Sequence, residues 1–430
     1  MFSDELIEKI RGAFLRVDRD ADGRKRIFFD NGTGTLVLRR AADAEAKARV
    51  DWSANVGAIF SESKKAEEVI SEGREAVADL LNAPSPGTIV SGESATSLLF
   101  GLSYAIGKSL DGSENIVTTE YEHYANISPW LELKRRGLVR EVRFARLIKD
   151  EGVLDLDHLK TLVDKKTGII AVTAASNVLG TKSPLKEIGK IARDINAYFI
   201  VDAVHHIPHG PIDVRDIDCD FLVFSGYKFF TSHGSFLYGK EEHLETLRPY
   251  KVEPAPDYPP YKFELGTRDQ SKFAAIKAVV EYLIWISEQL VGPYEDLLAK
   301  YSGRVRSLMS AMSAIEKYEK ELSKAMLTGY KDAPGLMEIP NLKVYGIKDI
   351  NRLDERDPTF AFKVENIPDE EVVEKFWVKH GIALRSENYY SKVPEVYGVP
   401  SMIRATLVHF NTLNEVYTFL KALNEIVKFN

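Results

Sequence analysis

The 430-residue sequence contains a single cysteine, Cys219, so no disulfide can form within the chain and no cysteine-based metal cluster is expected. No apolar run approaches the roughly 18 residues that a membrane helix needs. The opening stretch, MFSDELIEKIRGAF, is amphipathic and lacks the apolar centre of a secretory signal. Long basic runs are also missing, and the net charge is −7. We therefore expect a cytoplasmic protein whose partners are neither membranes nor nucleic acids.

The composition is that of a globular protein, with 44% hydrophobic and 28% charged residues. A chain this long exceeds the size at which a single core stops growing, so two domains are expected. Strand-like and helix-like patterns alternate between residues 46 and 295, which indicates a mostly parallel sheet flanked by helices. A long helical pattern begins near residue 293, and short strands follow it. We predict an α/β fold with a large domain over 46–295 and a smaller α+β domain built from 1–45 and 296–430.

Polar residues follow three of the predicted strands. These strands are expected at 168–176, 197–204 and 220–226. Asn177 follows the first, Asp202 lies near the end of the second, and Lys228 follows the third. Ligands of an open parallel sheet bind outside the carboxyl ends of its strands, so these side chains should meet. A lysine and a carboxylate in one crevice suit pyridoxal phosphate, which needs an amine for its imine and an acid beside its pyridine nitrogen.

Two further stretches fit such a site. TIVSGESATSLLFGLSYAIG (88–107) predicts a strand, a turn at Gly92 and a helix. A helix that opens after a glycine turn can bind phosphate, although Ser94 is also explained as an ordinary helix cap. In YEHYANISPW (121–130), His123 can stack on a cofactor ring or serve only as a structural residue.

Five segments, in this order, carry a family resemblance: EHYANISPW, SNVLGT, VDAVHHIPH, DFLVFSGYK and MIRATLVHFNT. With them, the chain from FFDNGTG (28–34) to its end resembles the class V aminotransferases of pyridoxal phosphate fold type I. It is most similar to the cysteine desulfurase and selenocysteine lyase branch, within a desulfurase-like subgroup. The resemblance implies the fold type I architecture and pyridoxal 5'-phosphate as cofactor.

The resemblance also implies roles for the matching residues. Lys228 would be the catalytic lysine that forms the imine, Asp202 the partner of the pyridine nitrogen, and His123 the catalytic-site ring stacked on the cofactor. Asn177 would lie near the phenolate oxygen, beside His205, which stands where the family has glutamine. The remaining residues would hold the phosphate: Gly92, Glu93, Ser94, Ser225 and Tyr227, the last at a usual histidine position.

Substrate and subunit contacts follow from the same resemblance. Arg404 would pair with the α-carboxylate of the substrate, a planar anion that suits a guanidinium group, with Arg385 and Asn31 as further substrate-binding residues. Thr267 matches a threonine that reaches the phosphate of the neighbouring subunit. The implied assembly is a homodimer with active sites at the subunit interface.

One departure from the family decides the predicted reaction. Desulfurases carry a catalytic cysteine on a mobile loop, but RSENYYSKVPEV (385–396) has Tyr389 and Tyr390 there. Cys219 precedes a strand, near the end opposite the cofactor, and cannot replace it. We therefore predict C–S bond cleavage of a small amino acid by β-elimination, without a persulfide relay. An aminotransferase and a non-catalytic partner protein of the same fold are the alternatives.

The three histidines of VHHIPH (His205, His206 and His209) are not expected to bind a metal. Adjacent histidines followed by proline seldom share one ligand geometry, and the sequence places no carboxylate at helical spacing from them.

Overall fold

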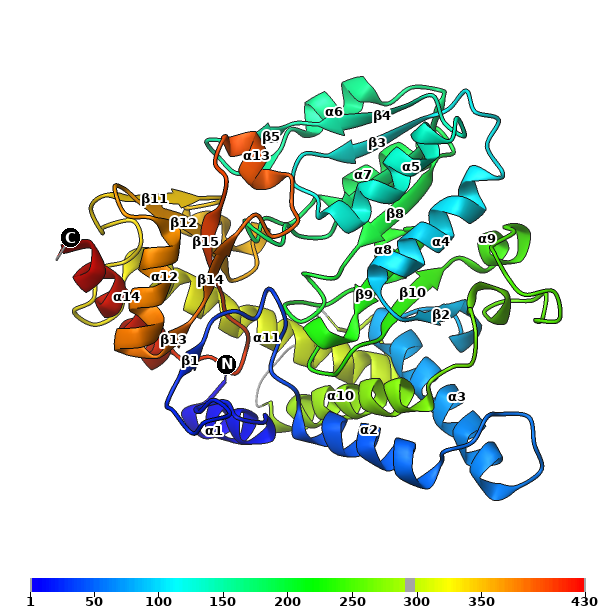
Figure 1. Cartoon of the computed structure of the whole chain (residues 1–430), viewed down its shortest axis with the longest axis horizontal. Coiled ribbons are helices and arrows are strands. Elements are labelled where there is room, and N and C mark those ends of the chain that lie inside the picture. The colour runs from blue at the N-terminus through cyan, green and yellow to red at the C-terminus, as the bar shows by residue number, and fades with distance from the viewer. Residues whose placement is uncertain (1, 291–297, 429–430) are drawn as a thin grey trace.

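Figure 1 shows the computed structural model of the chain, which describes residues 2–290 and 298–428. Its larger sheet has the strand order β2-β10-β9-β8-β7-β3-β4. The strands are β2 (Ile89–Gly92), β3 (Asn115–Thr119), β4 (Glu141–Ala145), β7 (Thr167–Thr173), β8 (Tyr198–Asp202), β9 (Phe221–Ser225) and β10 (Ser235–Gly239). Only β10 runs antiparallel to its neighbours in this sheet. The predicted mostly parallel sheet is confirmed, and its six parallel strands end at the same edge.

Apolar residues alternate between the two faces of this sheet, and both faces are covered. Ile169 and Ala171 of β7 pack in the core with α4 (Ala95–Gly107) and α5 (Ser128–Arg135). Ile170 and Val172 belong to the opposite core, which also contains residues of α7 and α10. Burial on both faces explains the near-continuous apolar runs of the central strands. The other helices around this sheet are α2 (Arg39–Asp51), α3 (Ser61–Leu81), α6 (Leu156–Leu162), α7 (Leu185–Asp194), α8 (Val214–Ile217), α9 (Glu241–Thr246) and α10 (Gln270–Gln289), and β5 (Leu147–Ile148) pairs with β6 (Val153–Leu154).

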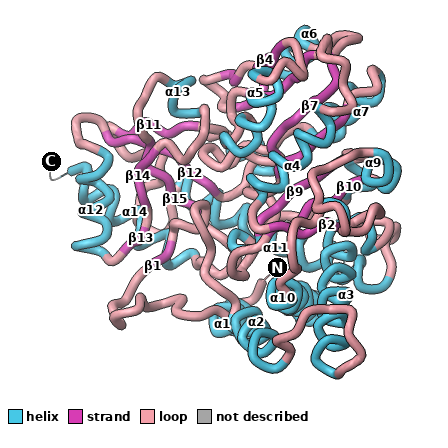
Figure 2. The backbone as a smooth tube through the Cα atoms, turned by 45° about the vertical axis from the view of Figure 1, so that its right-hand side comes forward, coloured by secondary structure: helices cyan, strands magenta, loops and turns pink. Residues whose placement is uncertain are grey.

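A second, antiparallel sheet has the order β11-β12-β15-β14 and lies to one side of the first, as Figure 2 shows. Its strands are β11 (Leu342–Tyr345), β12 (Thr359–Val364), β14 (Arg385–Glu387) and β15 (Met402–Thr406). The helices of this part are α11 (Gly303–Thr328), α12 (Asp369–His380), α13 (Val393–Tyr397) and α14 (Leu413–Lys428). The long helical pattern read from residue 293 therefore becomes a helix that begins at Gly303, and the part of the pattern at 293–297 lies outside the described residues.

The amino-terminal segment is attached to the second sheet's part of the fold. Strand β1 (Ile27–Phe28) pairs in parallel with β13 (Ile382–Ala383). In α1 (Asp4–Ala13), the Arg11 guanidinium donates to the carbonyl of Phe410 at 2.7 Å and to the Glu415 carboxylate at 3.0 Å. These contacts attach α1 and β1 to the carboxyl-terminal part, whereas α2 packs against α10 beside the large sheet. The domain boundaries stay a prediction. Among the described residues, no helix is both long and apolar enough to cross a bilayer.

Candidate active site

The carboxyl edge of the large sheet brings the predicted cofactor residues together. The pairing register sets Thr173 of β7 beside Asp202 of β8, and Asp202 beside Val223 of β9. One cavity at this edge is lined by eight of the residues singled out in the sequence: Ser94, His123, Asn177, Asp202, His205, Ser225, Tyr227 and Lys228. The sequence did not single out its other lining residues, Ala95, Thr96, Ala125, Thr173 and Val204.

Lys228 ends a short 3-10 turn directly after β9 and lines this cavity. The amine donates a hydrogen bond to the carbonyl of Gly32. Burial lowers the pKa of Lys228 to about 7, and the Arg404 guanidinium contributes to the lowering while Asp202 acts in the opposite direction. A large part of this amine is therefore uncharged near neutral pH, which is the form that attacks a carbonyl.

Asp202 is buried, His123 is half-buried, and both line the cavity of Lys228. The Val204 N–H donates to Oδ1 of Asp202 at 2.9 Å, and burial raises the pKa of this carboxyl to about 6. His123 accepts the Ala125 N–H on Nδ1 at 3.0 Å, so its neutral ring carries the proton on Nε2. Burial, together with the Lys228 charge, lowers the pKa of His123 to about 4. The ring is thus an uncharged surface of the cavity.

Arg404 reaches the site from β15 of the small sheet. Its Nη1 donates to the carbonyl of Asn177 at 2.7 Å, and its Nη2 donates to Oγ1 of Thr33 at 2.6 Å. Asp30 lies 3.7 Å from Nη2. The Nε atom is buried and has no hydrogen-bond partner within the described part of the chain. A buried arginine donor without an acceptor is costly, and it fits an anion that binds there.

The absence of a side chain at Gly32 lets the guanidinium of Arg404 lie close to the backbone of residue 32. A Cβ atom at Gly32 would lie 2.6 Å from Oγ1 of Thr406 and 2.8 Å from Cζ of Arg404. Only glycine leaves room for the guanidinium at this point. Asp30, Gly32 and Thr33 were missed as site residues, although FFDNGTG was part of the matched stretch.

The other two predicted substrate residues are placed differently. Arg385 donates from Nε to Oδ2 of Asp30 at 2.9 Å, and 45% of its side chain is exposed, so Asp30 lies between the two arginines. The Asn31 amide donates to the carbonyls of Phe28 and Thr406 at 3.2 and 2.9 Å. These bonds hold the small part of the fold together, and the substrate role of Asn31 stays a prediction without support from this geometry.

The predicted phosphate turn is divided between two cavities. Ser94 caps α4, where its Oγ accepts the Ser97 N–H at 3.1 Å, and it lines the cavity of Lys228. Gly92, Glu93 and Thr267 line a neighbouring cavity instead. The Glu93 carboxylate pairs with Lys272 at 2.5 Å and is 83% exposed. Glu93 therefore points away from the amino end of α4, and its phosphate role stays a prediction.

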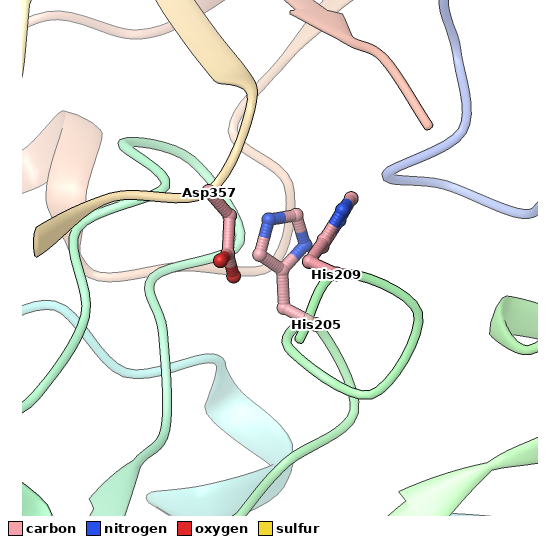
Figure 3. Close-up of side chains that lie close together, drawn as sticks. All are labelled: His205, His209 and Asp357. Atoms are coloured by element: carbon pink, nitrogen blue, oxygen red, sulfur yellow. The ribbon is translucent and has the colours of Figure 1, made fainter. Parts of the chain in front are cut away.

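Three buried histidines, of which His205 lines the cavity, form a network with residues of the carboxyl-terminal part. His205 contacts Oγ1 of Thr359 through Nε2 at 2.9 Å, and His206 Nδ1 lies 3.0 and 3.1 Å from the two carboxylate oxygens of Asp357. His209 Nδ1 lies 2.9 Å from Glu319. Figure 3 shows His205 between Asp357 and His209. Their potential ligand atoms lie within 4.8 Å of one another.

The protonation states of this network follow from its burial. Burial raises the pKa of Glu319 well above its usual range and lowers the pKa of His209 to about 4, so both partners are neutral and the acid donates to Nδ1. Although burial opposes it, the charge and hydrogen bond of His206, together with the charge of Lys182, hold the pKa of Asp357 below its usual range. Both oxygens of Asp357 already face His206, with Lys182 at 3.8 Å, so the arrangement is that of a hydrogen-bonded network. The expectation that no metal binds stays a prediction.

The fold and this site define a protein of the α/β type with a lysine-centred cavity at the sheet edge. The Aminotransferase class-V profile matches residues 27–305, and the chain belongs to this family, whose enzymes depend on pyridoxal phosphate. The chain is 29% identical to a cysteine desulfurase of Pectobacterium atrosepticum over 98% of both chains. It is 30% identical to a probable cysteine desulfurase of Synechocystis over 99% of this chain and 96% of the relative.

Solved structures agree on the fold. The apo cysteine desulfurase of Thermococcus onnurineus NA1 has a TM-score of 0.82 and 25% identity, with 100% of both chains covered. A cysteine desulfurase of Escherichia coli has a TM-score of 0.79 at 22% identity and supports the fold alone. The predicted family, the fold type and the assignment as an enzyme of the class-V aminotransferase family are confirmed.

Proposed function

We propose that the chain is a pyridoxal phosphate-dependent enzyme that cleaves a C–S bond of a small α-amino acid by β-elimination. The observation that carries the proposal is Lys228: the amine of a half-buried lysine with a pKa of about 7, in one cavity with the Asp202 carboxyl. Lysines are rarely held in such a position without a chemical task.

The residues around Lys228 fit the cofactor. Lys228 would bind its aldehyde carbon, Asp202 would face the pyridine nitrogen, and His123 offers a neutral ring for stacking. The N–H groups of Ala95 and Thr96, at the start of α4, have no acceptor within the helix and would bind the phosphate, together with the hydroxyls of Ser94, Ser225 and Tyr227. The second N–H of the Asn177 amide, whose first donates to the Tyr389 carbonyl at 3.1 Å, would serve the phenolate. When bound, pyridoxal phosphate supplies the electron sink for the bonds around Cα.

The substrate's α-carboxylate would bind Arg404, because the unpartnered Nε donor lies beside Nη2 on one edge of the guanidinium group. Arg385 would strengthen the local positive charge. Once the carboxylate is held, Lys228 can take the Cα proton as a general base, and the sulfur substituent leaves with the electron pair of the C–S bond. For L-cysteine, addition of one water gives pyruvate, ammonia and sulfide.

A persulfide relay has no candidate cysteine. Cys219 is the only cysteine of the sequence, it is fully buried, and it precedes β9 rather than following it. Burial also raises the pKa of the Cys219 thiol well above its usual value, which disfavours the reactive thiolate. Elimination needs no such thiol.

The experiment is product analysis after incubation of the cofactor-loaded protein with L-cysteine. Lys228→Ala serves as the inactive variant, and Lys64→Ala, at an exposed position of α3, is the matched control. Sulfide with equal pyruvate supports the proposal. Sulfide with alanine would overturn the elimination, and absence of sulfide would overturn the sulfur chemistry and favour an aminotransferase, to be sought with a panel of amino donors and keto acids. A protein that takes up no cofactor would leave only the non-catalytic alternative.

We also propose a homodimer. Thr267 lines the second cavity beside Arg268 and Lys272, and Leu265 in the same wall is 70% exposed. An exposed apolar residue at the wall of a largely apolar cavity suits a subunit interface. Light scattering of the purified protein should give twice the chain mass of 48.4 kDa, and a monomer would contradict the proposal.

A further inference from the structure

The ring of Tyr389 lies on the guanidinium of Arg404, with 3.9 Å between Cζ and the ring centroid. Tyr389 is only 3% exposed, so the contact is shielded from water. We propose that Tyr389 is a positioning residue that holds Arg404 ready for the substrate's carboxylate. This inference rests on the proposed function, because it assumes that Arg404 binds that carboxylate.

Tyr389 is itself fixed on three sides. Its hydroxyl donates toward the carbonyls of Arg385 and Met402, at 2.6 and 3.1 Å, and its own carbonyl accepts from Asn177. Its backbone has a φ of 56°, in the left-handed region that non-glycine residues rarely occupy. Such a conformation persists only where the surroundings hold it in place. One residue thus contacts both the substrate arginine and the asparagine of the cofactor cavity.

The geometry separates this role from simple core packing. Guanidinium donors lie in the plane of the group, so a ring on its face leaves the edges free for a carboxylate. Arg404 uses Nη1 and Nη2 for Asn177 and Thr33, while Nε keeps a free donor within the described residues. The nearest anion, Asp30, is 3.7 Å away. The ring therefore stabilises a buried cation without occupying its binding edge.

The test measures binding and does not depend on turnover. The probe is 3-mercaptopropionate, which has a carboxylate and a thiol but no amine that could react with the cofactor. Its Kd is measured by titration calorimetry on the cofactor-loaded protein at pH 8. Tyr389→Leu and Tyr389→Met, which lack an aromatic face, should weaken binding about tenfold, within the range of a desolvated cation–π contact. Tyr389→Phe keeps the face and should stay within about twofold of wild type.

Two controls make the result specific. Tyr397→Phe also removes a hydroxyl that donates to a backbone carbonyl, that of Lys149 at 2.7 Å, but it lies away from Arg404 and should leave the Kd unchanged. Arg404→Lys tests the assumption that Arg404 binds the carboxylate of the probe. If Arg404→Lys weakens binding and the Leu and Met variants do not, the role of Tyr389 is refuted while the proposed function stands.

Two other outcomes would contradict the inference. If Arg404→Lys leaves the Kd unchanged, Arg404 is not the carboxylate site and the inference falls with that part of the proposed function. If Tyr389→Phe loses as much affinity as Tyr389→Leu, the hydroxyl rather than the ring is responsible, which contradicts the inference. Thermal melts identify a variant that has lost its fold, and either the Leu or the Met variant suffices for the comparison.

Discussion

The lowered pKa of Lys228 can be tested directly by competitive labelling. The cofactor-free protein is treated with trace acetic anhydride between pH 5 and 11, and acetylation of Lys228 is read by mass spectrometry. Lys64, exposed on α3, is the internal reference for loss of reagent. Because the reagent attacks only the neutral amine, the labelling curve reports the fraction of uncharged Lys228.

The neutral fraction of Lys228 is expected to differ strongly from that of an ordinary lysine. With a pKa of about 7, Lys228 is about 90% neutral at pH 8. An ordinary lysine, with a pKa near 10.4, is about 0.4% neutral at this pH, so the neutral fraction differs by about 230-fold. Burial is the main cause, and it disfavours the charged ammonium form.

Two substitutions test the charge contributions, which have opposite signs. Arg404→Gln removes a cation that lowers the pKa of Lys228, so the labelling midpoint should move to higher pH. Asp202→Asn removes an anion that raises it, so the midpoint should move to lower pH. A midpoint above pH 9 in the wild type, or shifts of the same sign in both variants, would refute the reasoning.

Three further predictions concern the histidine network and Arg404. Asp357→Asn should cost about 3–5 kcal/mol of unfolding free energy in urea at pH 7, because it breaks a buried charge pair; since the folded pKa of Asp357 lies below the unfolded value, the difference from wild type should shrink as the pH falls below about 4. Glu319→Gln should change the melting temperature little, since the amide still donates to His209, whereas Glu319→Leu should cost about 1–3 kcal/mol; equal melting temperatures for the two would contradict a neutral donor. Gly32→Ala should weaken 3-mercaptopropionate binding in calorimetry by displacing Arg404, and an unchanged Kd would argue against that steric limit.

The sequence predicted the sheet edge well because the relevant signals are local. Asn177, Asp202 and Lys228 each follow or end an apolar run, and the parallel sheet rule brings such positions together. The structure confirms that they share a cavity. The antiparallel β10 was not predicted, since its short apolar run resembles that of its parallel neighbours.

Contacts between the two parts of the fold could not be read from the sequence. Asp357 reaches His206 and Glu319 reaches His209 across 151 and 110 residues of chain, with no periodic pattern that links them. Tyr389 and Arg404 belong to the same part of the fold, but no periodic pattern in the sequence indicates that the ring covers the guanidinium. The division of the phosphate turn depends on the direction of the Glu93 side chain, which Lys272 decides from a helix 179 residues away.

The turn that carries Tyr389 and Tyr390 is held by its backbone. The Tyr390 carbonyl accepts the Tyr124 N–H at 2.7 Å, and the Lys392 N–H donates to the Glu122 carbonyl at 3.2 Å. The side chain of Tyr390 is 70% exposed. The side chain of Tyr390 can therefore be replaced while the backbone hydrogen bonds of the turn are kept. A Tyr390→Cys protein would place a thiol near His123, whose ring lies 6.2 Å from that of Tyr390. Comparing its reaction products with those of the parent protein would show what a cysteine at this position adds to the reaction.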